Sequence, residues 1–282
     1  MKEDGERARM TGDKRNTYLM REGVVFPNSP AAAGLPEAEI EKRQASFNAR
    51  RTLLRSNPSL YISKTRLSIR QLPLFVTDRG LKRLAIYAVR EFDAEVEAGT
   101  REGLTRAEET DDTLSAALAA RKEKKKRGER ETAVIQSKVV RQSEKLDPLT
   151  GQGRSKGYGF LEMRSHKDAL KVLRWANNNP EAGVLFGEWW KVELGEILER
   201  TKTSLAAARE AKKEEAEEIE ARVRRLESRV AEKTLENGMR GGKTLMIEYS
   251  IENVQVSTTP LSSSLNLTSG RQASGGEDHR PT

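Results

Sequence analysis

The residues best suited to chemistry in this sequence form a short run of glycines, aromatics and one cation. The run is Lys156-Gly157-Tyr158-Gly159-Phe160-Leu161-Glu162-Met163. Side chains alternate along a strand, so Tyr158 and Phe160 would share one face while Leu161 and Met163 point to the other. Two aromatic rings on an open sheet give bases something to stack on. The glycines would let a nucleotide approach the backbone, and Lys156 could meet a phosphate. The alternative is that both aromatics are ordinary core residues.

A second run, Arg66-Leu67-Ser68-Ile69-Arg70-Gln71-Leu72-Pro73, reads as a partner strand. Together the two runs resemble the RNP1 and RNP2 signatures of the RNA-recognition motif. Two positions depart from that pattern: Ser68 stands where the family usually has a stacking aromatic, and Gln71 replaces the usual Asn. Arg70 shares the face of Ser68 and could stack on a base or bind phosphate. The candidate RNA-binding residues are Lys156, Tyr158, Phe160, Arg70, Ser68, Gln71, Lys138 and Arg154.

Four strands and two helices would have to position these residues. Apolar residues recur at helical spacing between 77 and 92 and again between 169 and 176. Thr77 or Asp78 can cap the first helix, and Ser165 with Asp168 resembles a capping box for the second. Further strands are predicted at 134–141 and 245–249, and a turn at 147–151. The order β-α-β-β-α-β predicts an α+β, ferredoxin-like fold: a four-stranded antiparallel sheet with two helices on one face.

Two long insertions interrupt this predicted domain, which we place at residues 59–255. They cover about 94–132 and 183–241. The first contains a basic patch formed by Lys122, Lys124, Lys125, Lys126 and Arg127. This patch suits a nuclear localisation signal, an arm that binds ribosomal RNA, or a solvated helix end. Residues 1–58 form a polar lead-in with a helical stretch from 36 to 54, and residues 256–282 have the composition of a disordered tail.

The second insertion is predicted to be one long, exposed, charged helix. It lacks Gly and Pro from 196 to 237 and is dominated by Glu, Lys, Arg and Ala. A short apolar seam recurs at coiled-coil spacing: Ile219, Val223, Leu226 and Val230. Two heptads are too few for a stable coiled coil, so the seam should pack on another part of this protein or on one partner helix. Trp189 and Trp190, after a loop from Gly183 to Gly187, are expected to anchor the helix to the domain.

The composition narrows the classes of function. Of 282 residues, 51 are Lys or Arg and 43 are Asp or Glu, and the net charge of +8 suits a polyanionic partner. The sequence has no cysteine and two histidines, which excludes disulfides and thiolate zinc sites. We see no paired catalytic acids, phosphate loop, metal cluster or cofactor motif, and therefore expect no enzyme, no cofactor and no small-molecule substrate. Without a secretory signal or an apolar span, an intracellular protein without membrane contact is the expectation.

A narrower resemblance extends over residues 14 to 255. It is carried by Arg15-Asn16-Thr17-Tyr18-Leu19-Met20-Arg21-Glu22-Gly23, Ser63-Lys64-Thr65-Arg66-Leu67, Asn177-Asn178-Asn179-Pro180-Glu181 and Ile247-Glu248-Tyr249-Ser250-Ile251-Glu252. These segments resemble the last RNA-recognition motif of the nucleolar protein four family, whose vertebrate relative is RNA-binding motif protein twenty-eight. The resemblance implies a nuclear and nucleolar factor for large ribosomal subunit assembly, with pre-rRNA and pre-ribosomal assembly factors as partners. The family's upstream motifs are missing, so the chain resembles a fragment, a short isoform or a truncated gene model.

Two alternatives remain open at this level. The missing aromatic at Ser68 suits a module of this fold that docks on assembly factors through its helices and insertions, with little or no RNA contact. The same chemistry would also serve an mRNA-processing factor.

Overall fold

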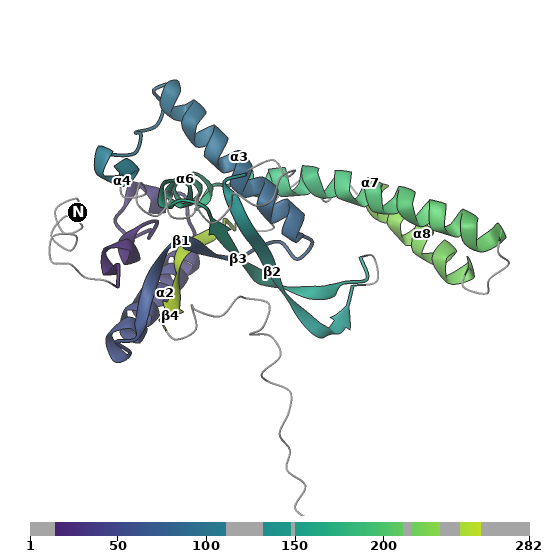
Figure 1. The fold of residues 1–282 in the computed structure, drawn as a ribbon, viewed down its shortest axis with the longest axis horizontal. Coiled ribbons are helices and arrows are strands. Elements are labelled where there is room, and N and C mark those ends of the chain that lie inside the picture. Colours follow the sequence, from purple (N-terminus) through teal and green to yellow (C-terminus); the bar gives the residue numbers. More distant parts are fainter. Residues whose placement is uncertain (1–14, 111–131, 148–149, 211–215, 232–242, 255–282) are drawn as a thin grey trace, which may run out of the picture.

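The sheet follows the predicted order. The structure, a computed structural model, describes residues 15–110, 132–147, 150–210, 216–231 and 243–254. Its main elements are β1 (Leu60–Arg70), α3 (Asp78–Glu97), β2 (Val134–Leu146), β3 (Gly153–Met163), α6 (His166–Ala176) and β4 (Met246–Asn253). The strands form one antiparallel sheet in the order β2-β3-β1-β4 (Figure 1). This confirms the RRM-like α+β fold with insertions.

Helices α3 and α6 cover one face of the sheet and bury its apolar residues. Leu67 and Ile69 of β1, Leu161 of β3 and Ile247 of β4 are fully buried in this core. The helices begin where predicted, because capping side chains accept their first free backbone N–H groups. Thr77 Oγ1 accepts from Gly80 N, and Ser165 Oγ accepts from Asp168 N. The first helix runs on to Glu97, beyond the predicted start of the first insertion at 94, and a short helix α4 (Arg106–Thr110) follows it.

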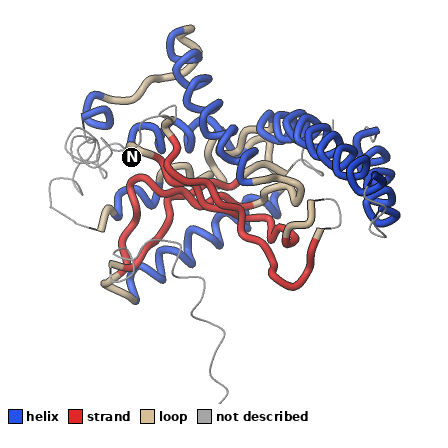
Figure 2. Tube along the Cα trace, turned by 45° about the vertical axis from the view of Figure 1, so that its right-hand side comes forward, coloured by secondary structure: helices blue, strands red, loops and turns tan. Residues whose placement is uncertain are grey.

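The N-terminal lead-in contains a long helix on the opposite face of the sheet. Two 3-10 turns, η1 (Thr17–Arg21) and η2 (Pro30–Ala32), precede α2 (Glu37–Ser56), which confirms the predicted helical stretch. Polar side chains of α2 reach β4, and Leu54 near its end joins the main core. In Figure 2 helices therefore lie on both sides of the strands. The sheet is sandwiched along part of its width.

The second insertion is a helical hairpin, so the prediction of one long exposed helix was wrong. Helix α7 (Glu181–Glu210) and helix α8 (Ala216–Ala231) run antiparallel and project together from the sheet (Figure 1). Ion pairs Lys202–Glu227 and Arg209–Glu220 link the two helices. The seam packs within this chain rather than on a partner. The residues of this second core are Trp190, Leu194, Leu198, Leu205, Val223 and Leu226, with Ile219 and Val230 at its margin.

The predicted loop from Gly183 to Gly187 was also wrong, because both glycines lie inside α7. Both are buried where the helix meets the domain, and a residue without a side chain suits such a close approach. The prediction that the two tryptophans anchor this element is confirmed. Trp189 belongs to the main core and meets Tyr87 of α3 edge-on, with ring centroids 5.9 Å apart. Trp190 belongs to the hairpin core and stacks on Phe75 at 6.0 Å.

Three predictions concern segments outside the described residues: the basic patch at 122–127, most of the first insertion and the tail at 256–282. Within the described residues, no helix combines the length and apolar character that a membrane span requires.

Candidate nucleic-acid interface

Strand register brings the predicted aromatic pair onto the face opposite α3 and α6. Residues directly paired across strands share a face. Phe160 pairs with Ser68 of β1 and Lys138 of β2, and Tyr158 pairs with Arg70. The two rings lie edge to face with centroids 6.4 Å apart, and both are half-buried. This geometry leaves ring surface accessible for stacking.

The glycines of this strand are required by the backbone itself, while the approach of a nucleotide over them stays a prediction. Gly157 adopts a φ of 77°, a left-handed conformation that favours glycine. A Cβ on Gly159 would stand 2.7 Å from the carbonyl oxygen of Lys138 and 3.2 Å from the Cα of Val139. Gly159 lies on the core side, one residue from each aromatic. Because Gly159 has no side chain, β3 can pair closely with β2. Its missing side chain does not change the face that carries the aromatic rings.

Helix α2 covers the β4 half of the same face. Met246, Glu248 and Ser250 alternate along β4 away from the main core, yet all three are buried. Arg50 of α2 donates to the carbonyl oxygen of Tyr249, and its Nη1 lies 3.4 Å from Glu248 Oε1. The uncovered part of the face is therefore the part on β2, β3 and the adjoining edge of β1.

Both ends of this contact carry a buried guanidinium. Arg43 donates to Thr244 Oγ1 at 2.9 Å and to the carbonyl oxygen of Leu245 at 3.2 Å. Burial lowers the pKa of both Arg43 and Arg50, and Glu248 opposes that shift for each. An arginine pKa starts so high that both side chains stay charged at neutral pH. Glu248 thus supplies the negative charge that compensates the two buried arginines of α2.

The three candidates on β1 and directly after it lie beside α2 or opposite Glu248, which α2 contacts. Arg70 Nη1 donates to Ser46 Oγ at 2.9 Å, and its Nη2 lies 3.7 Å from Glu248 Oε2. Ser68 pairs directly with Glu248. Gln71 has a φ of 63° and donates its side-chain amide to Glu39 at 2.6 Å. The structure therefore places Gln71 as a backbone turn and a tether for α2, which sequence reasoning did not foresee.

The remaining predicted residues are distributed around the aromatic pair. Lys138 is half-buried and pairs with Phe160 from the β2 side, while Lys156 and Arg154 are exposed on β3. Earlier in β1, Arg66 Nη1 lies 2.9 Å from Glu252 and its Nη2 lies 3.7 Å from Glu162. The cations near the aromatic pair therefore lie apart from Arg66, which is paired with two glutamates.

Sequence reasoning missed the residues of α2, although a signal was present. The buried residues Arg43, Phe47, Arg50 and Leu54 recur at 4-3-4 spacing. That spacing marks one face of a helix, but two of the four are arginines, so a search for apolar residues passes over it.

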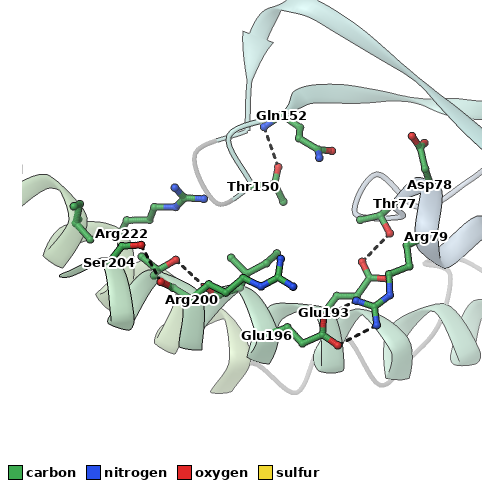
Figure 3. Close-up of a pocket in the computed structure, with 13 residues that line it drawn as sticks. Thr77, Asp78, Arg79, Thr150, Gln152, Glu193, Glu196, Arg200, Ser204 and Arg222 are labelled. Atoms are coloured by element: carbon green, nitrogen blue, oxygen red, sulfur yellow. Dashed lines mark hydrogen bonds and ion pairs between the residues drawn. The ribbon is translucent and has the colours of Figure 1, made fainter. Parts of the chain in front are cut away.

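A separate cleft of about 690 Å³ lies between α7, α8, the start of α3 and the turn after β2 (Figure 3). Its acids are already bonded: Glu193 accepts from Thr77 at 2.7 Å, and Glu196 pairs with Arg79. Arg200 and Arg222 rise into it from the two hairpin helices (Figure 3). Acids and cations are balanced here, and the cleft forms the polar junction between the hairpin and the domain. The described residues hold no group of three side chains suited to a metal.

One comparison with known proteins finds an RNA-binding relative. The chain is 28% identical over 169 residues to RNA-binding protein 28 of Homo sapiens, a match covering 59% of this chain and 17% of the relative. The chain thus spans less than a fifth of that relative's length. No family model matches the chain, and no solved structure matches it significantly. The likeness supports kinship with RNA-binding proteins of the RRM type, while the narrower resemblance to the nucleolar protein four family stays a prediction.

Proposed function

We propose that this chain binds unpaired RNA through the β2–β3 half of its sheet. The observation that carries the proposal is the pair of accessible rings, Tyr158 and Phe160, on the part of the face that no helix of the described residues covers. Lys138 pairs with Phe160, and the exposed Lys156 stands two residues before Tyr158 on β3, so both suit the phosphates between stacked bases. The likeness to RNA-binding protein 28 supports the same class of ligand.

The test is titration of short labelled RNAs against Tyr158→Ala and Phe160→Ala. Each should weaken binding by about 1–3 kcal/mol, the usual contribution of one aromatic–base stack. Neither should unfold the domain, because both rings lie outside the main core. Tyr61→Ala is the matched control: Tyr61 is also half-buried on the sheet, but its hydroxyl donates to Glu252 at 2.7 Å. Equal losses in all three variants, or none in the first two, would contradict the proposal.

We further propose pre-rRNA as the ligand and the nucleolus as the location, with a role in large-subunit assembly. The support is the sequence resemblance to the nucleolar protein four family, together with the net charge of +8. The test is a fluorescent fusion of the full chain, combined with sequencing of RNA crosslinked to it. Recovery of mRNA in place of pre-rRNA from a nucleoplasmic fusion would favour the mRNA-processing alternative.

A second candidate function is docking on assembly factors, with RNA contact weak. It is favoured by the covering of the β4 half of the face and by Ser68 in place of an aromatic. The projecting α7–α8 hairpin is the surface offered for such docking (Figure 1). Replacing residues 201–235 by a short linker should then reduce copurification with large-subunit factors and leave short-RNA affinity unchanged.

A further inference from the structure

Helix α2 occupies the part of the sheet face next to the two exposed rings. We propose that α2 stays seated when RNA binds, and that it limits the site to two unpaired nucleotides, one on Tyr158 and one on Phe160. The proposal rests on the proposed function, since it concerns the size of the same site. On this proposal α2 does not move, and its position limits the number of nucleotides that the domain contacts.

The width of the uncovered strip argues for two nucleotides. Each ring offers one stacking platform, and no other aromatic of β1, β2 or β3 pairs with them on this face. A third base would need the position of Ser68, which lies directly between Phe160 and Glu248 in the register. Glu248 is buried there, and Ser46 of α2 donates to both of its carboxylate oxygens, at 3.2 and 3.4 Å. A base on β4, or on the side of β1 next to β4, would therefore have to displace α2.

The attachment of α2 argues that it does not move. Its contacts extend along most of its length: Arg43 holds Thr244 from its first half, Arg50 holds Glu248 from its second half, and Leu54 joins the main core near its end. Phe47 meets Phe26 edge-on at 5.6 Å, which ties the helix to the preceding lead-in. A base that took the place of α2 would cover Glu248 without Arg50, and a covered charge that has lost its counter-charge is costly.

A length series tests the size of the site on the unaltered chain. Uridine oligonucleotides of one to six nucleotides would be titrated at constant salt. The second nucleotide should tighten binding by about 5- to 150-fold, the range for one further stack. Each later nucleotide should add no more than a few-fold, from extra registers and phosphate contacts. Equal steps at the third and fourth nucleotides would overturn the two-nucleotide limit.

A covalent lock tests whether α2 stays in place. The chain has no cysteine, so Arg43→Cys with Thr244→Cys gives one defined pair of thiols where the two native side chains meet. A short, reducible bis-maleimide would join them, on the β4 side and away from Tyr158. The locked protein should bind a dinucleotide within about twofold of the reduced protein, and each single-cysteine variant treated with the reagent is the control.

The outcomes separate the two proposals. A locked protein that loses tenfold or more in affinity, regained on reduction, would show that α2 moves aside, and would overturn this inference while leaving RNA binding intact. Absence of binding by the unaltered chain to every oligonucleotide would overturn the proposed function, and the inference with it.

Discussion

The buried pair between Arg50 and Glu248 offers the sharpest test of how α2 is held. The two side chains are only 8% and 7% exposed, and Arg50 also donates to the carbonyl oxygen of Tyr249. Removing one partner of a buried pair costs about 3–5 kcal/mol, because the other charge is left without compensation. Glu248→Met should cost this amount, since Arg50 then keeps only the carbonyl. Arg50→Met should cost about 2–3 kcal/mol, since Ser46 and Arg70 still face the carboxylate.

The double variant Arg50→Met, Glu248→Met tests whether the two charges compensate one another. Methionine keeps most of the length of both side chains and adapts to irregular gaps. Replacing a buried pair by packed apolar residues is often neutral or stabilising, so the double variant should lie within about 1 kcal/mol of the unaltered chain. Urea unfolding followed by circular dichroism gives each free energy. Strictly additive losses in the double variant would show that the two charges do not compensate one another, and would refute this account of the α2 seat.

Three further predictions follow from the same structure. Gly159→Ala should destabilise the domain by about 1–3 kcal/mol through overpacking, since its Cβ would meet the carbonyl oxygen of Lys138 at 2.7 Å; an unchanged urea midpoint would contradict this. Burial alone would raise the pKa of Glu108, but hydrogen bonds from Arg174 and Thr105 outweigh it and hold the pKa at about 2. That stabilisation is complete above the unfolded pKa near 4.5 and is lost as pH falls toward 2, so Glu108→Gln should flatten the acid limb of stability. The cost at pH 7 should be about 2 kcal/mol, less than the full shift implies, because solvent screens a carboxyl that is partly exposed. Leu226→Ala should loosen the α7–α8 hairpin in hydrogen exchange while β1 and β3 stay protected, because its core is separate from that of the sheet.

The sheet and its faces could be predicted because local patterns carry them. Alternation along one run placed Leu161 and Met163 on one face and Tyr158 and Phe160 on the other, as the register and the burial of the first two confirm. Helix starts followed from single capping residues, Thr77 and Ser165. These features depend on neighbours within a few positions, so the period of a strand or a helix is enough to reveal them.

The contacts that could not be predicted join segments distant in the sequence through polar groups. Arg50 contacts Glu248, which lies 198 positions later in the sequence. Arginine and glutamate are usually exposed, so neither residue type predicts burial. The hairpin was missed for a related reason: a charged stretch without Gly or Pro favours helix throughout, and nothing in it marked where α7 would end. Gly183 and Gly187 suggested a loop, yet tertiary packing against the domain outweighed their low helix propensity.

The two departures from the RNA-recognition pattern have one structural cause. Gln71 replaces an asparagine, takes a left-handed turn and uses its amide to hold Glu39 of α2. Ser68 replaces an aromatic and lies opposite Glu248, the residue to which Ser46 and Arg50 of α2 are bonded. A large ring at position 68 would project into this polar contact. Both substitutions therefore accommodate a helix that the sequence pattern of the sheet does not reveal, and the uncovered rings define the surface left for a ligand.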